Sequence, residues 1–110
     1  MEQDKARQYE GYIKEASHSI EEADFENFET LYQKALKVFP HQIDAYYQKA
    51  VALNAQGEYE ENILYITGTI LTDSRLLEQD EMLGNVYYLL GNAYEHTREN
   101  IPDAARSYEK

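Results

Sequence analysis

The apolar residues in the first two thirds of this sequence repeat with a constant offset of 34 residues. Tyr12 corresponds in this way to Tyr46, and Ala16 corresponds to Ala50. A unit of this length holds two short helices, which cannot bury an apolar face alone and must stack on a neighbouring unit. The chain is therefore expected to fold as stacked helix pairs. Two further pairs of positions share the offset: Phe25 with Tyr59, and Ala35 with Thr69.

A third unit follows with a longer offset, because Tyr46 corresponds to Tyr87 after 41 residues. The seven additional residues equal about two helical turns and predict a lengthened fifth helix. Within this unit Tyr87, Leu90, Gly91 and Tyr94 recur at helical spacing and are expected to form one packing face. Glycine costs stability inside a helix, so Gly91 indicates a close approach of a second helix.

Local signals divide the chain into six expected helices. Pro40 ends the second helix, since the residue before a proline is disfavoured in the α region. Gly57 suits the end of the third helix. The threonine- and glycine-rich stretch 67–72 is expected to bend or fray the fourth. The expected helices cover about 3–22, 24–39, 42–56, 59–71 and 75–97, and a sixth begins at 100–102.

The segment 87–94 resembles the tetratricopeptide repeat (TPR) motif W-x2-L-G-x2-Y, with Tyr87 in place of Trp. The segments 32–35, before Pro40, and 56–59 are similar to other parts of that repeat. The resemblance implies an all-α fold, a TPR-like right-handed α-solenoid of three antiparallel helix pairs. It implies one domain over residues 1–110, with repeats at about 9–42, 43–76 and 77–110. A helical bundle without repeats is the alternative. The sequence departs from the family pattern at Ala16, Ala50, Phe28, Asn62 and Ser74.

The charge of the chain limits its partners. The formal net charge is −11, and residues 50–74 contain no Lys or Arg. Such a surface repels nucleic acid and anionic membranes. Two readings remain open: a solvated surface, or attraction to a basic partner. The absence of Cys favours a reducing compartment. We find neither a signal peptide nor an apolar run long enough to span a membrane, and expect a cytoplasmic protein.

Catalytic motifs are sparse. Glu15 and His18 have the E-x-x-H spacing found in di-iron bundles, but such a site needs two of these motifs. Neither His41 nor His96 follows a Glu at this spacing, and the chain has no phosphate-binding Gly-rich loop and no Cys nucleophile. We therefore expect a protein that is not an enzyme and has no catalytic residues, no metal site and no cofactor.

The resemblance implies that the first helix of each pair lines a concave groove that holds a peptide or protein segment. Tyrosine suits such recognition because it offers a large ring and a hydroxyl at low entropy cost. The alternative is that Tyr47 and Tyr88 only pack between neighbouring helices. The expected groove residues are Ile13, Ser17, Tyr47, Val51, Asn54, Tyr88, Asn92 and His96.

The resemblance also separates this chain from one subgroup of the family. The chaperone-tail TPR proteins clamp a carboxylate with basic residues, and the matching positions here carry none. Those positions hold Ile13, Ser17, Gln48, Asn85 and Leu89.

A second function class stays open, a structural or oligomerisation element. The expected sixth helix carries Ala104, Ala105 and Tyr108, and nothing in the sequence follows to cover that face. This favours self-association, or a fragment of a larger protein. Some bacterial TPR segments accompany a Ser/Thr kinase domain, so a regulatory segment of that kind is a further alternative to a scaffold that binds a peptide.

Overall fold

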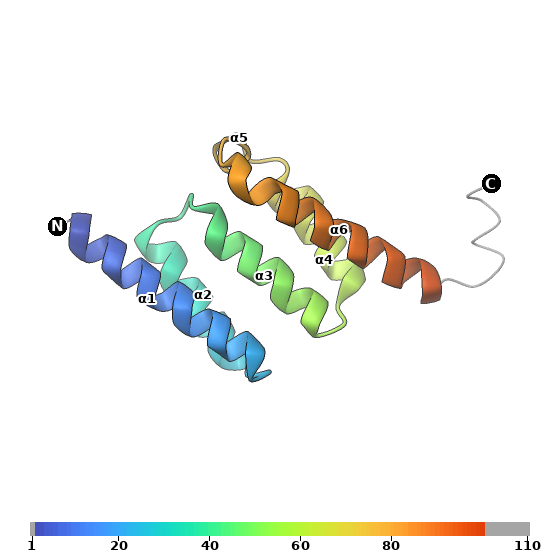
Figure 1. Ribbon diagram of the computed structural model, residues 1–110, viewed down its shortest axis with the longest axis horizontal. Helices are drawn as coiled ribbons and strands as arrows, with labels where there is room; N and C mark the ends of the chain where they lie inside the picture. The colour runs from blue at the N-terminus through green and yellow to red at the C-terminus, as the bar shows by residue number, and fades with distance from the viewer. Residues whose placement is uncertain (1, 101–110) are drawn as a thin grey trace.

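The computed structural model describes residues 2–100, and every regular element in that part of the chain is helical. The helices form antiparallel pairs that follow one another along the molecule (Figure 1). This architecture confirms the expected all-α, TPR-like repeat. The elements are α1 (Glu2–Glu21), α2 (Phe25–Val38), α3 (Ile43–Ala55), α4 (Tyr59–Tyr65), a π-helical segment (Ile66–Ile70), α5 (Ser74–Leu77) and α6 (Asp80–Asn100).

The first pair begins and ends where the sequence predicts. Asp24 caps α2, since its side chain accepts a hydrogen bond of 3.2 Å from the backbone N–H of Asn27. Ala23 has a φ of 59°, which lets the chain reverse between the helices. Phe39 leaves the helix with an extended backbone just before Pro40. The boundaries of the first three helices are therefore confirmed to within about two residues.

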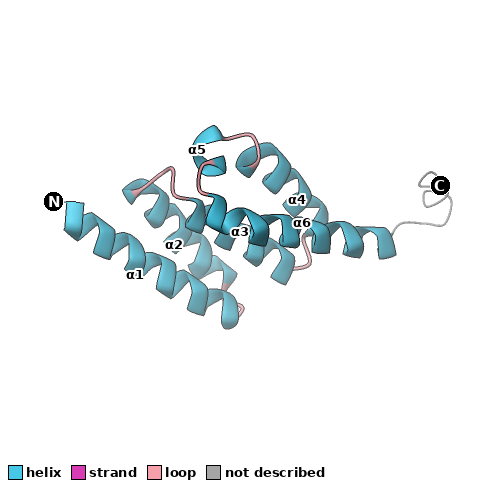
Figure 2. Cartoon of the chain, turned by 45° about the horizontal axis from the view of Figure 1, so that its top comes forward, coloured by secondary structure: helices cyan, strands magenta, loops and turns pink. Residues whose placement is uncertain are grey.

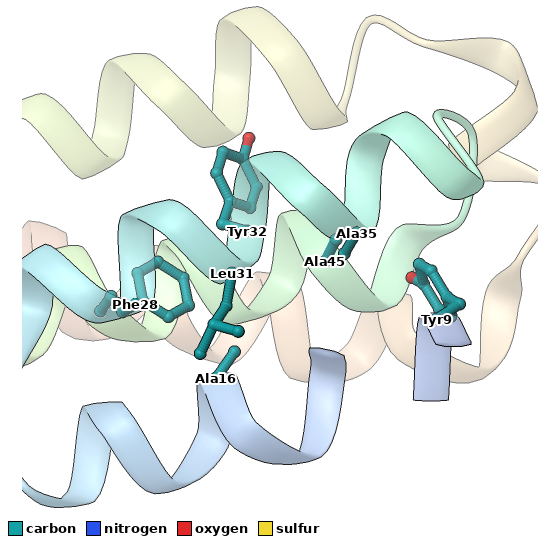
Figure 3. Close-up of a cluster of buried hydrophobic side chains, with 8 residues drawn as sticks. Tyr9, Ala16, Phe28, Leu31, Tyr32, Ala35 and Ala45 are labelled. Carbon is teal, nitrogen blue, oxygen red and sulfur yellow. The ribbon is translucent and has the colours of Figure 1, made fainter. Parts of the chain in front are cut away.

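Two clusters of buried side chains form the core. The first joins α1, α2 and α3 and contains the fully buried Phe28, whose ring centroid lies 5.9 Å from that of Tyr32 (Figure 3). The second joins α3 to the later helices and includes Ile66, Ile70 and Leu76. Helix α3 supplies residues to both clusters, so it connects the two halves of the fold.

The fourth helix departs from α geometry at the predicted threonine-rich stretch. The N–H of Leu71 bonds to the carbonyl of Ile66, five residues earlier, at 2.9 Å. The hydroxyl of Thr67 also bonds back to a carbonyl of the preceding turn, at 2.7 Å. This π-helical turn places both Ile66 and Ile70 in the core. The expected bend is confirmed, and its form is a π-helix.

The expected single helix over 75–97 is wrong, because the chain breaks into α5 and α6. Leu76 of α5 is fully buried in the second cluster. Gln79, between the two helices, accepts a hydrogen bond of 2.9 Å from the N–H of Ile43 and donates one of 2.7 Å to the carbonyl of His41. The break lets Leu76 fill the core while Gln79 supplies the partner that the first N–H of α3 lacks.

Helix α6 continues to Asn100, beyond the end expected near Thr97. The expected sixth helix, with Ala104, Ala105 and Tyr108, lies outside the described residues.

Candidate binding groove

Three helices supply the surface on which the sequence placed a binding site. Helices α1, α3 and α6 lie in succession, and α3 packs against both of its neighbours. Figures 1 and 2 show this succession from two directions, with α2 behind α1. Each of the three is the first helix of a pair, as the repeat predicts.

Two amide side chains of α3 hold this row of helices together. Gln48 donates a hydrogen bond of 2.9 Å to the carbonyl of Ile13 in α1. Asn54 donates one of 3.2 Å to the carbonyl of Leu89 in α6. Each amide reaches a backbone group of the neighbouring helix, so the spacing of the helices does not depend on apolar packing alone.

The expected groove residues differ in how much of each is available to a partner. Tyr88 is 70% exposed, whereas Tyr47 and Val51 are half-buried and pack against the second core cluster. Tyr47 therefore serves the packing between helices that the sequence left as an alternative, and Tyr88 does not. Of the others, Ser17 is exposed, and Ile13 and Asn92 are half-buried.

Two of the expected residues already have partners within the fold. The Asn54 side chain donates to Leu89 and accepts a 2.7 Å hydrogen bond from the side-chain amide of Asn62. The ring of His96 stacks on Tyr59 of α4, with centroids 4.3 Å apart and planes within 12°. Its Nδ1 lies 2.8 Å from the carbonyl oxygen of Asn92. We therefore assign Asn54 and His96 to holding helices together.

Asn62 was not expected in the site, yet it positions Asn54. It is fully buried in α4, and its amide donates to the carbonyl of Ala50 at 2.9 Å and to Asn54. The only sign in the sequence was a polar residue where the family pattern has alanine.

Replacing Asn62 with alanine is expected to lower the free energy of unfolding by about 1–3 kcal/mol, because the buried Ala50 carbonyl and Asn54 oxygen lose their donor. Asn62→Asp should cost more, since a carboxylate would face two oxygens. Urea unfolding measures both variants, with the exposed Asn85→Ala as the control. A change as small as that of the control would contradict the role of Asn62.

The packing face expected in the segment 87–94 is wrong. Tyr87 and Tyr94 are 54% and 47% exposed, and a Cβ added at Gly91 would meet no other atom within 4 Å. Helix α6 instead buries a neighbouring face against α3 and α4. A helix that would cover the tyrosine face is not among the described elements, so the motif has no partner there. The buried residues of α6 are Val86, Leu89 and Ala93.

An acidic hollow lies beside the N-terminal ends of α3 and α6. It has a volume of about 460 Å³, and four carboxylates line it together with apolar atoms of Ile43 and Met82. None of the lining residues is basic. The sequence showed the acidic residues but not their convergence, because they come from segments more than 30 residues apart. The four carboxylates are those of Asp44, Glu78, Asp80 and Glu81.

The described residues also bear on metal binding and on membranes. Within residues 2–100, no three His, Asp or Glu side chains gather as ligands for a metal ion. Glu15 and His18 are both exposed, and His18 lies 3.9 Å from the Glu21 carboxylate. None of the described helices is both long and apolar enough to span a membrane.

Comparison with protein-family models gives a match in the first half of the chain. Residues 31–63, from the middle of α2 into α4, match the family model described as tetratricopeptide repeat. The search of curated proteins gives no match, and neither does the search of solved structures. The matched residues span the turn between the first two helix pairs, where the 34-residue offset and the observed helices agree. The chain belongs to the tetratricopeptide repeat family.

Proposed function

We propose that the chain is a non-catalytic interaction module that binds a peptide or protein segment across α1, α3 and α6. Membership of the TPR family indicates a protein-interaction module in general, and the family is typically non-catalytic. The observation that carries the finer proposal is Tyr88, a large aromatic side chain that is 70% exposed on α6. An exposed tyrosine beside half-buried apolar residues is typical of a recognition surface.

The contact residues in this proposal are those of the expected set that retain free surface. Tyr88 and Asn92 contribute from α6, and Tyr47 and Val51 from α3. Ile13 and Ser17 extend the surface onto α1. Asn54 and His96, whose polar groups have partners within the fold, position the helices beneath the ligand.

Charge favours a basic ligand. The chain carries a net charge of −11, and four carboxylates gather in the hollow at the N-terminal ends of α3 and α6. A Lys or Arg side chain of the partner would find both opposite charge and apolar atoms there. Such a contact would raise the association rate at low ionic strength and weaken with added salt.

The Tyr88→Ala substitution tests the groove. We expect at least about a 30-fold loss of affinity, the effect of removing a central aromatic contact. The partner is first captured from native extract by chemical cross-linking and identified by mass spectrometry. Its affinity for each variant is then measured by titration calorimetry.

The control is Leu64→Ala in α4, because Leu64 is 72% exposed, much like Tyr88, but lies outside the row of α1, α3 and α6. Circular dichroism must show that both variants keep the helical fold. A Tyr47→Ala/Tyr88→Ala double variant should lose more affinity than Tyr88→Ala alone. Equal affinities of Tyr88→Ala and Leu64→Ala for the captured partner would refute the groove.

A further inference from the structure

Helix α6 lacks a cover that the corresponding helices α1 and α3 possess. Ala16 in α1 and Ala50 in α3 occupy the same position of the repeat, and both are fully buried. Gly91 occupies this position in α6 after the 41-residue offset, and it is exposed. Among the described residues, nothing lies within 4 Å of a Cβ added there. The third unit therefore has a packing surface without a partner.

This surface, which we name the α6 face, consists of Tyr87, Leu90, Gly91 and Tyr94. Both tyrosines are about half exposed, and Leu90 is half-buried at the edge. Two large aromatic rings thus flank a glycine, at which another helix can approach closely because no side chain stands in the way. A monomeric soluble protein rarely leaves such a surface open without a use for it.

The ten residues that follow Asn100 are too few to cover the α6 face as a helix. Three residues join the helices in each of the first two pairs. A turn of that length after Asn100 leaves residues 104–110, which would rise about 10 Å as a helix. Gly91 lies nine residues before the end of α6, about 14 Å along its axis, and Tyr87 lies farther. An extended segment would leave its backbone groups unpaired on an apolar surface.

The α6 face is complementary to itself. In an antiparallel pair of α6 helices with a twofold axis between Leu90 and Gly91, residues pair when their numbers add to 181. Tyr87 then meets Tyr94 of a second copy, and Leu90 fills the space above Gly91 of that copy. Aromatic rings face each other, and a large side chain faces a missing one, as an isologous interface requires.

We propose that the α6 face joins two copies of this chain in a symmetric dimer, with α6 packed antiparallel on α6. Each copy carries a net charge of −11, so the copies repel each other at low ionic strength. The dimer should therefore tighten as salt is added. Tyr88 is not part of the α6 face, so the dimer presents two groove surfaces.

The chain contains no cysteine, so a single introduced thiol reports on this interface. Gly91→Cys would place a thiol beside the twofold axis and should form a disulfide-linked dimer under mild oxidation. Gly11→Cys in α1 is the matched control, because Gly11 is also exposed and also has no atom within 4 Å of an added Cβ. It should cross-link at least about tenfold more slowly, since a thiol outside the interface meets its copy only by random collision.

Sedimentation equilibrium gives the second readout. The wild-type chain should dimerise, and Gly91→Arg should sediment as a monomer with an unchanged circular dichroism spectrum. Three results would overturn the proposal: a wild-type monomer at high concentration, equal cross-linking of both thiol variants, or a monomeric Gly91→Cys variant whose thiol resists alkylation because the same chain covers it. Partner capture by Gly91→Arg separates this proposal from the groove, because that variant keeps Tyr88.

Discussion

Replacing Phe28 with alanine is expected to lower the free energy of unfolding by about 3–5 kcal/mol, the range for deleting a buried aromatic ring. Phe28 is 1% exposed and lies in the cluster that joins α1, α2 and α3 (Figure 3). Its ring packs against that of Tyr32 at 5.9 Å. The change would remove both the apolar contacts and this ring pair, and leave a cavity.

The size of the effect matters because small helical domains are marginally stable, so a loss of this size approaches the stability of the whole chain. Urea unfolding followed by circular dichroism measures it. Tyr88→Ala removes another aromatic ring, but from an exposed site, and should change stability by no more than about 0.5 kcal/mol. Similar losses in both variants would mean that the first cluster is not the core of the fold.

Alkaline pH is expected to destabilise the chain steeply. Burial raises the pKa of Tyr65 above the ordinary value of 10.0, and the nearby Tyr32 adds to the effect. Burial also raises the pKa of Tyr9, with a contribution from the negative charge of Asp44. The hydroxyls of Tyr32 and Tyr65 share a hydrogen bond of 2.8 Å, and neither ring can become a phenolate without losing burial or that bond.

The direction follows from the higher pKa in the folded state. Below about pH 10 both states keep these protons, and stability does not depend on these groups. Above that pH the unfolded chain loses protons that the folded chain retains. Each of the two tyrosines then costs about 1.4 kcal/mol per pH unit, or about 3 kcal/mol for both over one unit. The loss ends only when the pH passes the folded-state pKa.

Urea unfolding at a series of pH values measures this slope. The Tyr9→Phe/Tyr65→Phe double variant keeps the rings but removes the titrating groups, so its stability should fall less steeply in the alkaline range. A double variant that retains the wild-type slope would show that other groups cause the alkaline loss.

The alternation of helices and turns could be predicted because local chemistry determines it. Asp24 supplies a helix cap and Pro40 ends a helix through contacts within a few residues. The offset of 34 residues predicted how the first two pairs stack. The bend near residues 67–72 was also predictable, since threonine and glycine weaken an α-helix wherever they occur.

The break between α5 and α6 could not be predicted, because no residue there ends a helix by itself. Gln79 is a good helix former, and it lies between α5 and α6 because its amide bonds to the start of α3, 36 residues away. The same holds for Asn62, a polar residue that is stable in the core only because Ala50 and Asn54 accept its hydrogen bonds.

The candidate site shows the same division. The sequence by itself determined the helices, their repeat and the position of Tyr88 on the first helix of a pair. Only the tertiary structure decided that Tyr88 stands exposed while Tyr47 packs inward, that Asn54 and His96 already have partners, and that the tyrosine face around Gly91 lacks one. A repeat pattern states which faces of a helix are apolar. Which of those faces is covered depends on the neighbouring helix that is present, and that is a property of the folded chain.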